Sequence, residues 1–369
     1  MSKRSLKRSL AAAPMDAAAE ERAWEVVRAA FVEREPVPRR LPLRVAILGA
    51  AAAVAAAAAA FSPPGRAVVD AVRRSIGIEH AVPALFRLPA PGRLLVSGDG
   101  GTWVVAADGS KRRLGGYEQA SWSPHGLYVV AATANELAAI EPETGNVHWT
   151  LARPEISFPR WGGSRTDTRV AYLSTSRLHV VGGDGRGDVD AEELPAAARV
   201  APAWRPGDRH VLAYVTTRGR VVVLDPDAGR VEWVSRGYSG PRSLAWSPDG
   251  RRLALAARAK VVLFDARSGR ARAVPVTGIR AVAYARDGRL ALLRERAVLE
   301  LHGVDVRTLF TAPGRLAGVA WSPNARWLLT SLPDADQWIF LGGRHVVAVS
   351  HIGRQFGGVP VLDGWMSGR

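Results

Sequence analysis

The loop over residues 182–193 gathers acidic residues among glycines. It reads GGDGRGDVDAEE, in which Asp184, Asp188 and Asp190 supply carboxylates. Calcium prefers several oxygen ligands on a flexible loop, so these three aspartates form a candidate calcium site. Arg186 stands where the calcium loop of a helix–loop–helix motif would place an acid, which argues against that family of sites. The sequence favours a solvated hairpin loop and keeps calcium as the weaker alternative.

The residue types that build most catalytic and metal sites are missing or scattered. The chain has no cysteine, which excludes disulfides, thiolate metal sites and cysteine nucleophiles. It has no Gly-x-Ser-x-Gly nucleophile elbow, and no two histidines stand at metal-binding spacing. We therefore assign no catalytic or cofactor-binding residue, no cofactor, and no metal ligand beyond the calcium candidate. The eight histidines fall singly in different repeats or turns, and we interpret each as a loop or strand-surface residue rather than a metal ligand. They are His80, His125, His148, His179, His210, His302, His345 and His351.

The formal net charge of +16 and the isoelectric point near 11.1 raise the question of a nucleic-acid partner. Clustered cations bind phosphates by releasing counterions. Here the arginines are scattered one or two per strand, and only four basic residues are lysine (Lys3, Lys7, Lys111 and Lys260). This distribution favours solvated loop ends over a polyanion surface, and we expect no nucleic-acid partner.

An aromatic residue recurs at a regular distance through most of the chain. The close copies of its setting are SWSPHG, AWSPDG, AYARDG and AWSPNA, and the looser ones are RWGGSRTD, AWRPGD and DGWMSG. In such a turn Pro fixes φ, Asp or Asn accepts a local amide, and Gly takes positive φ. Successive copies lie 37 to 44 residues apart, a period typical of a four-stranded propeller blade. The seven landmarks are Trp122, Trp161, Trp204, Trp246, Tyr284, Trp321 and Trp365.

Each aromatic-bearing strand is followed by three β-rich runs, such as RLALAAR, KVVLFDA and RARAVPV after AWSPDG. The chain ends on an aromatic-bearing strand, VPVLDGW, while residues 93–116 supply RLLVSG, TWVVAAD and KRRLGG. One blade is therefore shared between the two ends, which closes the ring and removes its free edges. The sequence predicts an all-β fold, a seven-bladed β-propeller over residues 93–369.

The W-S-P-D-G turn before an apolar strand resembles the repeat of the TolB-like, WD40-like (PD40) propeller family, over residues 93–365. AIEPETGNVHW and VLDPDAGRVEW also resemble the tryptophan-bearing element of quinoprotein-type propellers. Members of that second family carry a cofactor and usually a cysteine pair, which this chain lacks. Trp149 and Trp233 are better interpreted as aromatics that pack between blades. Both resemblances imply the architecture rather than an activity, because propellers host many functions.

An alanine-rich segment before the repeats predicts a helical membrane anchor. VAILGAAAAVAAAAAAF has no charged residue, follows Arg39, Arg40 and Arg44, and ends at Pro63-Pro64. We divide the chain into a basic cytoplasmic segment (residues 1–42), a transmembrane helix (43–61), a linker (62–92) and the propeller (93–369). A cleaved signal peptide with export is the main alternative, because Ala58 and Ala60 offer a cleavage site, and a soluble alanine-rich helix is the other.

Ten Lys or Arg residues precede this segment, and cytoplasmic flanks collect such charge. We therefore expect a single-pass protein of the cytoplasmic membrane with its N-terminus inside and its propeller outside. Residues 19–33, AEERAWEVVRAAFVE, have the apolar spacing of an amphipathic helix that could dock a cytoplasmic partner.

The order of these parts predicts a non-enzymatic binding or sensor module. Its expected partner is a protein, a cell-envelope component or a small molecule on a propeller face. An enzyme, a lyase or oxidoreductase working in the propeller channel, is one alternative. A membrane-bound regulator acting through residues 1–42 is another.

Overall fold

The computed structural model describes residues 87–190, 193–207 and 209–368, which all belong to one compact unit. The membrane segment predicted at residues 43–61 and the amphipathic helix predicted at 19–33 lie outside these residues. Within the described part of the chain, no helix is long and apolar enough to cross a membrane.

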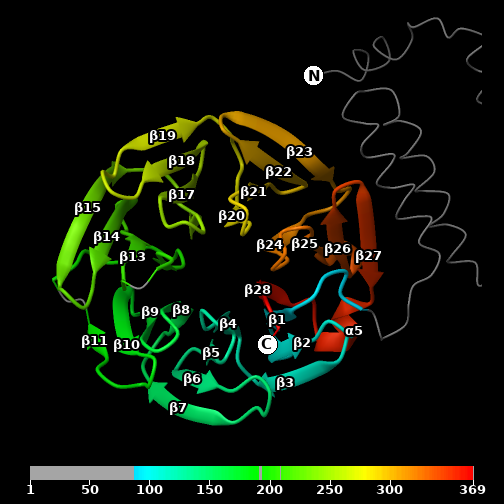
Figure 1. Ribbon diagram of the computed structural model, residues 1–369, viewed down its shortest axis with the longest axis horizontal. Helices are drawn as coiled ribbons and strands as arrows, with labels where there is room; N and C mark the ends of the chain where they lie inside the picture. The colour runs from blue at the N-terminus through cyan, green and yellow to red at the C-terminus, as the bar shows by residue number, and fades with distance from the viewer. Residues whose placement is uncertain (1–86, 191–192, 208, 369) are drawn as a thin grey trace, which may run out of the picture. The chain divides into compact units, whose positions relative to one another are not determined.

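Seven four-stranded antiparallel sheets stand around a central axis as blades (Figure 1). The innermost strands, in blade order from 1 to 7, are β28 (Val361–Met366), β4 (Gln119–Trp122), β8 (Ser157–Gly163), β12 (Ala203–Trp204), β16 (Ser243–Trp246), β20 (Ala281–Tyr284) and β24 (Ala317–Trp321). The second strands, in the same order, are β1 (Arg93–Ser97), β5 (Val129–Ala132), β9 (Thr168–Ser174), β13 (Leu212–Val215), β17 (Arg252–Ala257), β21 (Leu290–Leu293) and β25 (Leu328–Leu332).

The outer half of each blade repeats the same order. The third strands are β2 (Thr102–Val105), β6 (Glu136–Ile140), β10 (Arg177–Gly182), β14 (Arg220–Asp225), β18 (Lys260–Asp265), β22 (Ala297–His302) and β26 (Gln337–Gly342). The outermost strands are β3 (Lys111–Gly115), β7 (Val147–Ala152), β11 (Val189–Asp190), β15 (Arg230–Gly237), β19 (Ala271–Val274), β23 (Asp305–Thr311) and β27 (His345–Ser350). The seven-bladed all-β fold predicted from the sequence is confirmed.

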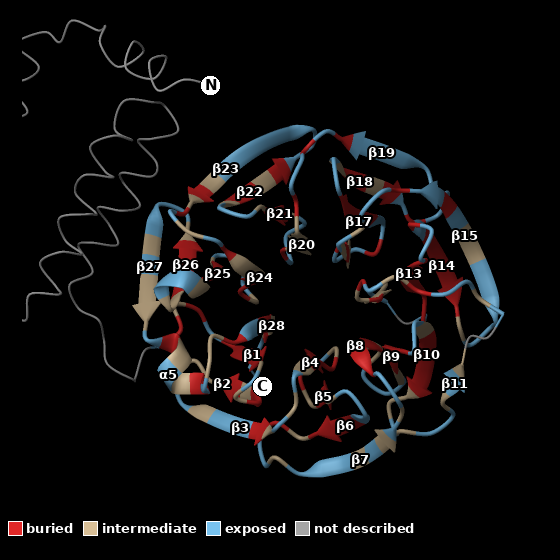
Figure 2. Cartoon of the chain, turned by 180° about the vertical axis from the view of Figure 1, so that it is seen from behind, coloured by how far each residue is buried: buried red, intermediate tan, exposed pale blue. Residues whose placement is uncertain are grey.

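The hydrophobic core lies between the blades. The second and third strands are covered on both faces by neighbouring blades, so their sequences are apolar at nearly every position; β5, β13 and β21 are buried throughout. The outermost strands face solvent, and their sequences mix polar with apolar residues, as those of β7 and β23 do. Figure 2 shows this as buried inner strands and exposed outer ones.

Blade 1 is assembled from both ends of the described chain. β28 pairs with β1, and Leu94 lies opposite Trp365 and Leu95 opposite Gly364. The short helix α5 (Ile352–Phe356) leads into β28 and buries Ile352 and Phe356 completely or nearly so. A 3-10 helix, η1 (Pro333–Ala335), links β25 to β26. No free sheet edge remains at this junction, because the last strand fills the place beside the first.

The repeated turn has the geometry that its residues require. After Trp246, Ser247 Oγ accepts the amide of Arg252 at 2.9 Å, and Asp249 Oδ1 accepts that of Arg251 at 3.0 Å. Gly250 adopts φ +65°. The copy after Trp321 uses Asn324 for the aspartate and places Ala325 at φ +57°. The turn therefore depends on a local polar side chain and one left-handed residue, as expected.

Candidate functional site: the inner strands and the boundary between blades 3 and 4

The seven aromatic landmarks lie on the innermost strands, and three of them donate a hydrogen bond to the previous blade. The indole Nε1 of Trp204 donates to Arg160 O at 2.9 Å, that of Trp246 to Ala203 O at 2.9 Å, and that of Trp321 to Ala283 O at 3.1 Å. Each acceptor directly precedes the landmark of the neighbouring blade. These tryptophans hold blades together and are not free to bind a ligand.

Arginines reinforce three of these blade contacts. Arg93, Arg205 and Arg289 stack over the landmark rings of the next blade at 5.0, 5.7 and 4.6 Å from the ring centroids. Each also donates to the carbonyl of the left-handed turn residue there, Gly126, Gly250 and Ala325 respectively. Some of the arginines therefore stabilise the contacts between blades. From the sequence we had expected these arginines at solvated loop ends.

The two tryptophans that resemble the quinoprotein element also join blades. Trp149 Nε1 donates to Gly183 O and Trp233 Nε1 to Ala266 O, both at 2.9 Å and both in the next blade. A Cβ on Gly185 or Gly269 would come within about 3 Å of the corresponding indole ring, so glycine lets the ring approach. This geometry agrees with a packing role for both tryptophans.

One acid and one arginine of the innermost strands influence each other through their charges. Asp363 lies in β28 at a β-bulge, where the register with β1 shifts between Leu95 and Val96. Arg160 lies in β8, which is also irregular, with Phe158 at φ +55°. Bulges re-aim side chains and are frequent near sites. Burial raises the pKa of Asp363 to about 7, while Ser97, the charge of Arg160 and the Ala120 amide act in the opposite direction.

The sequence analysis missed both residues, although the repeats contain a signal. Two positions before the other landmarks stand Ala120, Pro159, Pro202, Leu244, Val282 and Val319, and one position before them stand Ser121, Ala203, Ala245, Ala283, Ala320 and Gly364. Asp363 and Arg160 are the charged exceptions to these two columns. Burial also lowers the pKa of Arg160, while the nearby Asp363 raises it.

Two buried histidine–aspartate networks lie on the two sides of blade 3. The first connects blade 3 to blade 2: Asp188 accepts the Tyr172 hydroxyl at 2.8 Å and pairs with Arg153, the residue after β7, at 2.6 Å, and His179 Nδ1 lies 3.8 Å away. Burial alone would raise the pKa of Asp188, but the nearby His179, the hydrogen bond from Tyr172 and the charge of Arg153 bring the pKa below its usual value. The side chain is therefore held as a carboxylate.

The second network bridges blades 3 and 4. His210 of blade 4 contacts Asp227 through Nδ1, and its Nε2 lies 3.1 Å from Asp167 O of blade 3. Arg169 of blade 3 donates to Asp227 at 3.1 Å. The sequence analysis placed all eight histidines on loops or strand surfaces; His179 and His210 are instead buried, with 7% and 5% exposure.

The three calcium candidates have separate surroundings. Asp184 Oδ1 accepts the amide of Arg186 within its own turn at 3.0 Å, Asp188 belongs to the network with Arg153, and the nearest cation to Asp190 is Arg177 at 3.7 Å. Among the described residues, which omit 191 and 192 of this loop, no group of three or more acidic or histidine side chains could hold a metal ion.

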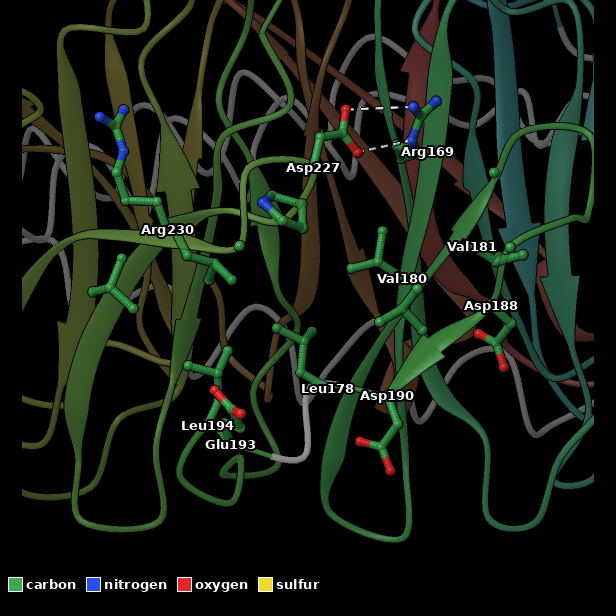
Figure 3. A pocket seen from close by; sticks show the side chains of 17 residues that line it. Arg169, Leu178, Val180, Val181, Asp188, Asp190, Glu193, Leu194, Asp227 and Arg230 are labelled. Atoms are coloured by element: carbon green, nitrogen blue, oxygen red, sulfur yellow. Dashed lines mark hydrogen bonds and ion pairs between the residues drawn. The ribbon is translucent and has the colours of Figure 1, made fainter.

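A pocket opens beside these networks, between β10 and β11 of blade 3 and β14 and β15 of blade 4 (Figure 3). We call it the blade 3–4 pocket. Its volume is about 670 Å³, within the usual range for ligand sites. Its apolar floor consists of Leu178, Val180, Leu194, Leu224 and Val231, and its charged lining includes Arg169, Asp188, Asp190, Glu193, Asp227 and Arg230.

A second hollow of about 550 Å³ adjoins it and shares Arg169, Gly182, Gly187 and Asp227 with it. Leu178, Val180 and Leu224 belong to the buried cluster between the blades, so the floor of the blade 3–4 pocket is fixed by the core. The arrangement is a rigid, partly apolar recess with carboxylates at its edge, suited to binding.

Comparisons with known proteins support the fold and nothing finer. No protein-family model and no curated protein matches the sequence. A chain in the crystal structure of the Mitotic Checkpoint Complex is similar, with 16% identity and a TM-score of 0.57, over 70% of this chain and 92% of that one. The β-propeller domain of Cps50 (Swd1) from Myceliophteria thermophila has 12% identity and a TM-score of 0.52, over 64% and 86%. The chain is thus a seven-bladed, WD40-like β-propeller.

Proposed function

We propose that this protein is a non-enzymatic interaction module whose propeller binds a protein partner. The observation that carries the proposal is the blade 3–4 pocket, a recess between two blades with an apolar floor and charged residues in its lining. A closed propeller is rigid and presents large loop-bearing faces, which suits a scaffold. One structural neighbour is itself a chain of a multiprotein complex, which is consistent with this role.

Membrane anchoring is part of the proposal and rests on the sequence of residues 43–61 and the basic residues before it. In this topology the N-terminus is cytoplasmic and the propeller extracytoplasmic, with a cell-envelope component or a small molecule as further partners. The finer likeness to TolB-like (PD40) propellers rests on the W-S-P-D-G turns. Membrane fractionation, protease protection and N-terminal sequencing of the mature chain test this topology. A mature N-terminus after Ala60 would replace the anchor with a cleaved signal.

The binding function is tested with the tagged full-length chain. We expect chemical cross-linking in its native membranes, followed by purification, to recover a stoichiometric protein partner that untagged cells do not yield. Recovery of no partner across growth conditions would contradict the proposal. A reporter fusion that places the N-terminus outside would exclude the alternative in which residues 1–42 regulate a cytoplasmic factor.

An enzyme acting in the channel is the second candidate, because Asp363 and Arg160 both lie on innermost strands and burial raises the pKa of Asp363 to about 7. Acids with such values serve in general acid–base catalysis. A thermal-shift screen of small carboxylates and sugars against the wild type and the Asp363→Asn variant tests this candidate. A compound that stabilises the wild type but not the variant would favour an active channel.

A further inference from the structure

Two hollows with basic linings lie side by side around blade 5, at the upper left of the ring in Figure 1. The blade 4–5 hollow has a volume of about 540 Å³ and the blade 5–6 hollow about 470 Å³. Arg258 connects them, because its amide donates to Ser239 O at 3.0 Å and its carbonyl accepts the Gly278 amide at 3.4 Å. The basic lining residues are Arg236, Arg258 and Lys260 in the first hollow, and Arg242, Arg280, Arg294 and Arg296 in the second.

These cations, which we call together the basic hollows, have no acidic partners. Within residues 87–190, 193–207 and 209–368, none of their side chains forms an ion pair. Glu295 is the one acid among the lining residues. On the opposite face of blade 6 the arrangement differs, since Arg289 pairs there with Asp287 at 2.9 Å. The unpaired charges are therefore a property of this face.

The like charges are close enough to repel one another. Burial lowers the pKa of Arg280, the charges of Arg315 and Arg242 lower it further, and Glu295 acts in the opposite direction. Repulsion of this kind raises the free energy of the unliganded site, and an anion that binds between the cations removes it.

Two of the guanidinium groups are held in place before any ligand arrives. Arg294 Nε donates to Thr277 O at 3.1 Å, which leaves both of its terminal nitrogens for another acceptor. Arg236 lies over the Tyr238 ring at 5.4 Å from the centroid. A guanidinium group with free terminal nitrogens matches the two oxygens of a carboxylate, so these arginines are prepared for bidentate pairing.

The lining favours an acidic polypeptide over a nucleic acid or a single small anion. Tyr238 is the one aromatic lining residue, and it is buried at 7% exposure beneath Arg236, so no base has a ring to stack on. Arg242 and Arg296 are exposed and come from different loops. Cations spread over several loops and two hollows suit a chain that carries several carboxylates.

We propose that the basic hollows bind an acidic segment of a protein partner, with Asp or Glu side chains pairing with arginines on both sides of Arg258. In an extended segment, side chains on the same side follow one another at about 7 Å, so one segment offers carboxylates to both hollows. This inference rests on the proposed interaction function but is independent of the blade 3–4 pocket.

The test measures binding of a fluorescent octaglutamate peptide to the purified full-length chain by anisotropy. The hollow variant carries Arg242→Glu and Arg296→Glu, which change two exposed side chains. The control variant carries Arg251→Glu and Arg286→Glu, which change two exposed arginines of the same blades on the opposite face, so the net charge changes equally. We expect the hollow variant to lose at least about tenfold in affinity and the control variant to stay within about twofold of the wild type.

Two further probes decide the class of ligand: an oligothymidylate of the same charge and inorganic phosphate. The inference is overturned if the peptide does not bind the wild type or if both variants weaken its binding equally. It is also overturned if the oligothymidylate binds more tightly than the peptide and loses affinity in the hollow variant. Displacement of the peptide by phosphate, but not by chloride of the same ionic strength, would show a site for a single anion and would likewise overturn it.

The cross-linking experiment separates failure of this site from failure of the interaction function. A partner recovered equally with the wild type and the hollow variant leaves the function standing and removes this site. Recovery of no partner with the wild type removes the function itself.

Discussion

At the scale of single residues, Asp363 shows how one position can differ chemically from its six equivalents. It occupies a column that is apolar in the other blades, it lies at a bulge in β28, and the charge of Arg160 acts on its carboxyl group. Its Oδ2 has no hydrogen-bond partner although that atom is buried. The cost of ionising such a group appears as a raised pKa and therefore as a pH-dependent stability.

We expect Asp363→Asn to flatten this pH dependence. In the wild type, the pKa rises from 3.8 to about 7 on folding, so the folded state binds more protons than the unfolded state between these values. The free energy of unfolding therefore falls as the pH rises through this window. Between about pH 4.5 and about pH 8, the free energy of unfolding of the variant should rise by a few kcal/mol relative to that of the wild type. This follows from about 1.4 kcal/mol for each unit of pKa shift. Urea unfolding of both proteins at the two pH values measures this.

An exposed acid supplies the control for that measurement. Asp305→Asn changes the same chemical group on the surface of β23, and its unfolding should follow the wild type at both pH values. If the free energy of unfolding changes with pH by the same amount in the Asp363→Asn variant and the wild type, the raised pKa of Asp363 is wrong.

The energetic cost of the left-handed backbone at a turn glycine can be measured separately from steric clashes. Gly288 has φ +88°, and a Cβ added there would meet nothing within 4 Å, so Gly288→Ala isolates the cost of the left-handed conformation. We expect a loss of about 1–2 kcal/mol in thermal or urea unfolding. Gly116 also has open space around it and no positive φ, so Gly116→Ala should be neutral or slightly stabilising. Equal effects at both positions would contradict the role assigned to the turn.

At the scale of elements, the blades are joined by side chains that reach from one sheet into the next. Tryptophan indoles donate to carbonyls of the neighbouring blade, and three arginines stack on the landmark rings while donating to turn carbonyls. Arginine suits this position because its planar group can stack and donate at once, which an ammonium cannot do.

Arg289→Lys should therefore destabilise the protein although it keeps the charge. The variant loses the stacking on Trp321 and the hydrogen bond to Ala325 O, for an expected cost of about 1–2 kcal/mol. Arg286 lies three residues earlier in the same turn and is exposed, so Arg286→Lys is the matched control and should change the unfolding free energy by less than about 0.5 kcal/mol. If the two variants had the same free energy of unfolding, the stacking of Arg289 on Trp321 would contribute nothing to stability.

At the scale of the whole molecule, the ring depends on one strand from the end of the chain. β28 completes blade 1 and fills the place against blades 2 and 7, where Leu362 and Trp365 are buried. Without it, β1 would present a free edge and the ring would lose contacts on both sides.

A circular permutant tests whether closure or chain order matters. Removing residues 359–369 should abolish cooperative unfolding and cause aggregation, seen by calorimetry and size-exclusion chromatography. A second protein that starts at residue 117, joins residue 367 to residue 93 through a short flexible linker and ends at residue 116 contains every blade intact. It should fold with stability near that of the repeat region in native order. A folded, monomeric truncation would contradict the closing role of β28.

The repeat period, the turn chemistry and the split of one blade between the chain ends were readable from the sequence, because a propeller blade is a local unit repeated about every 40 residues. Cross-blade contacts were not readable. Arg289 and Trp321, or Asp363 and Arg160, come from different blades, and whether two such side chains interact depends on how the sheets pack. An alignment of the repeats marks the two charged exceptions but does not bring them together.

The landmark aromatics, by their spacing alone, determined that this chain forms seven blades. Tertiary structure alone decided where a partner has room to bind. The blade 3–4 pocket lies where apolar side chains of β10 and β14 come together, and two of its carboxylates, Asp188 and Asp227, have arginine partners from other parts of the chain. Local periodicity specifies an element, whereas a site depends on which side chains of neighbouring elements remain unsatisfied after packing.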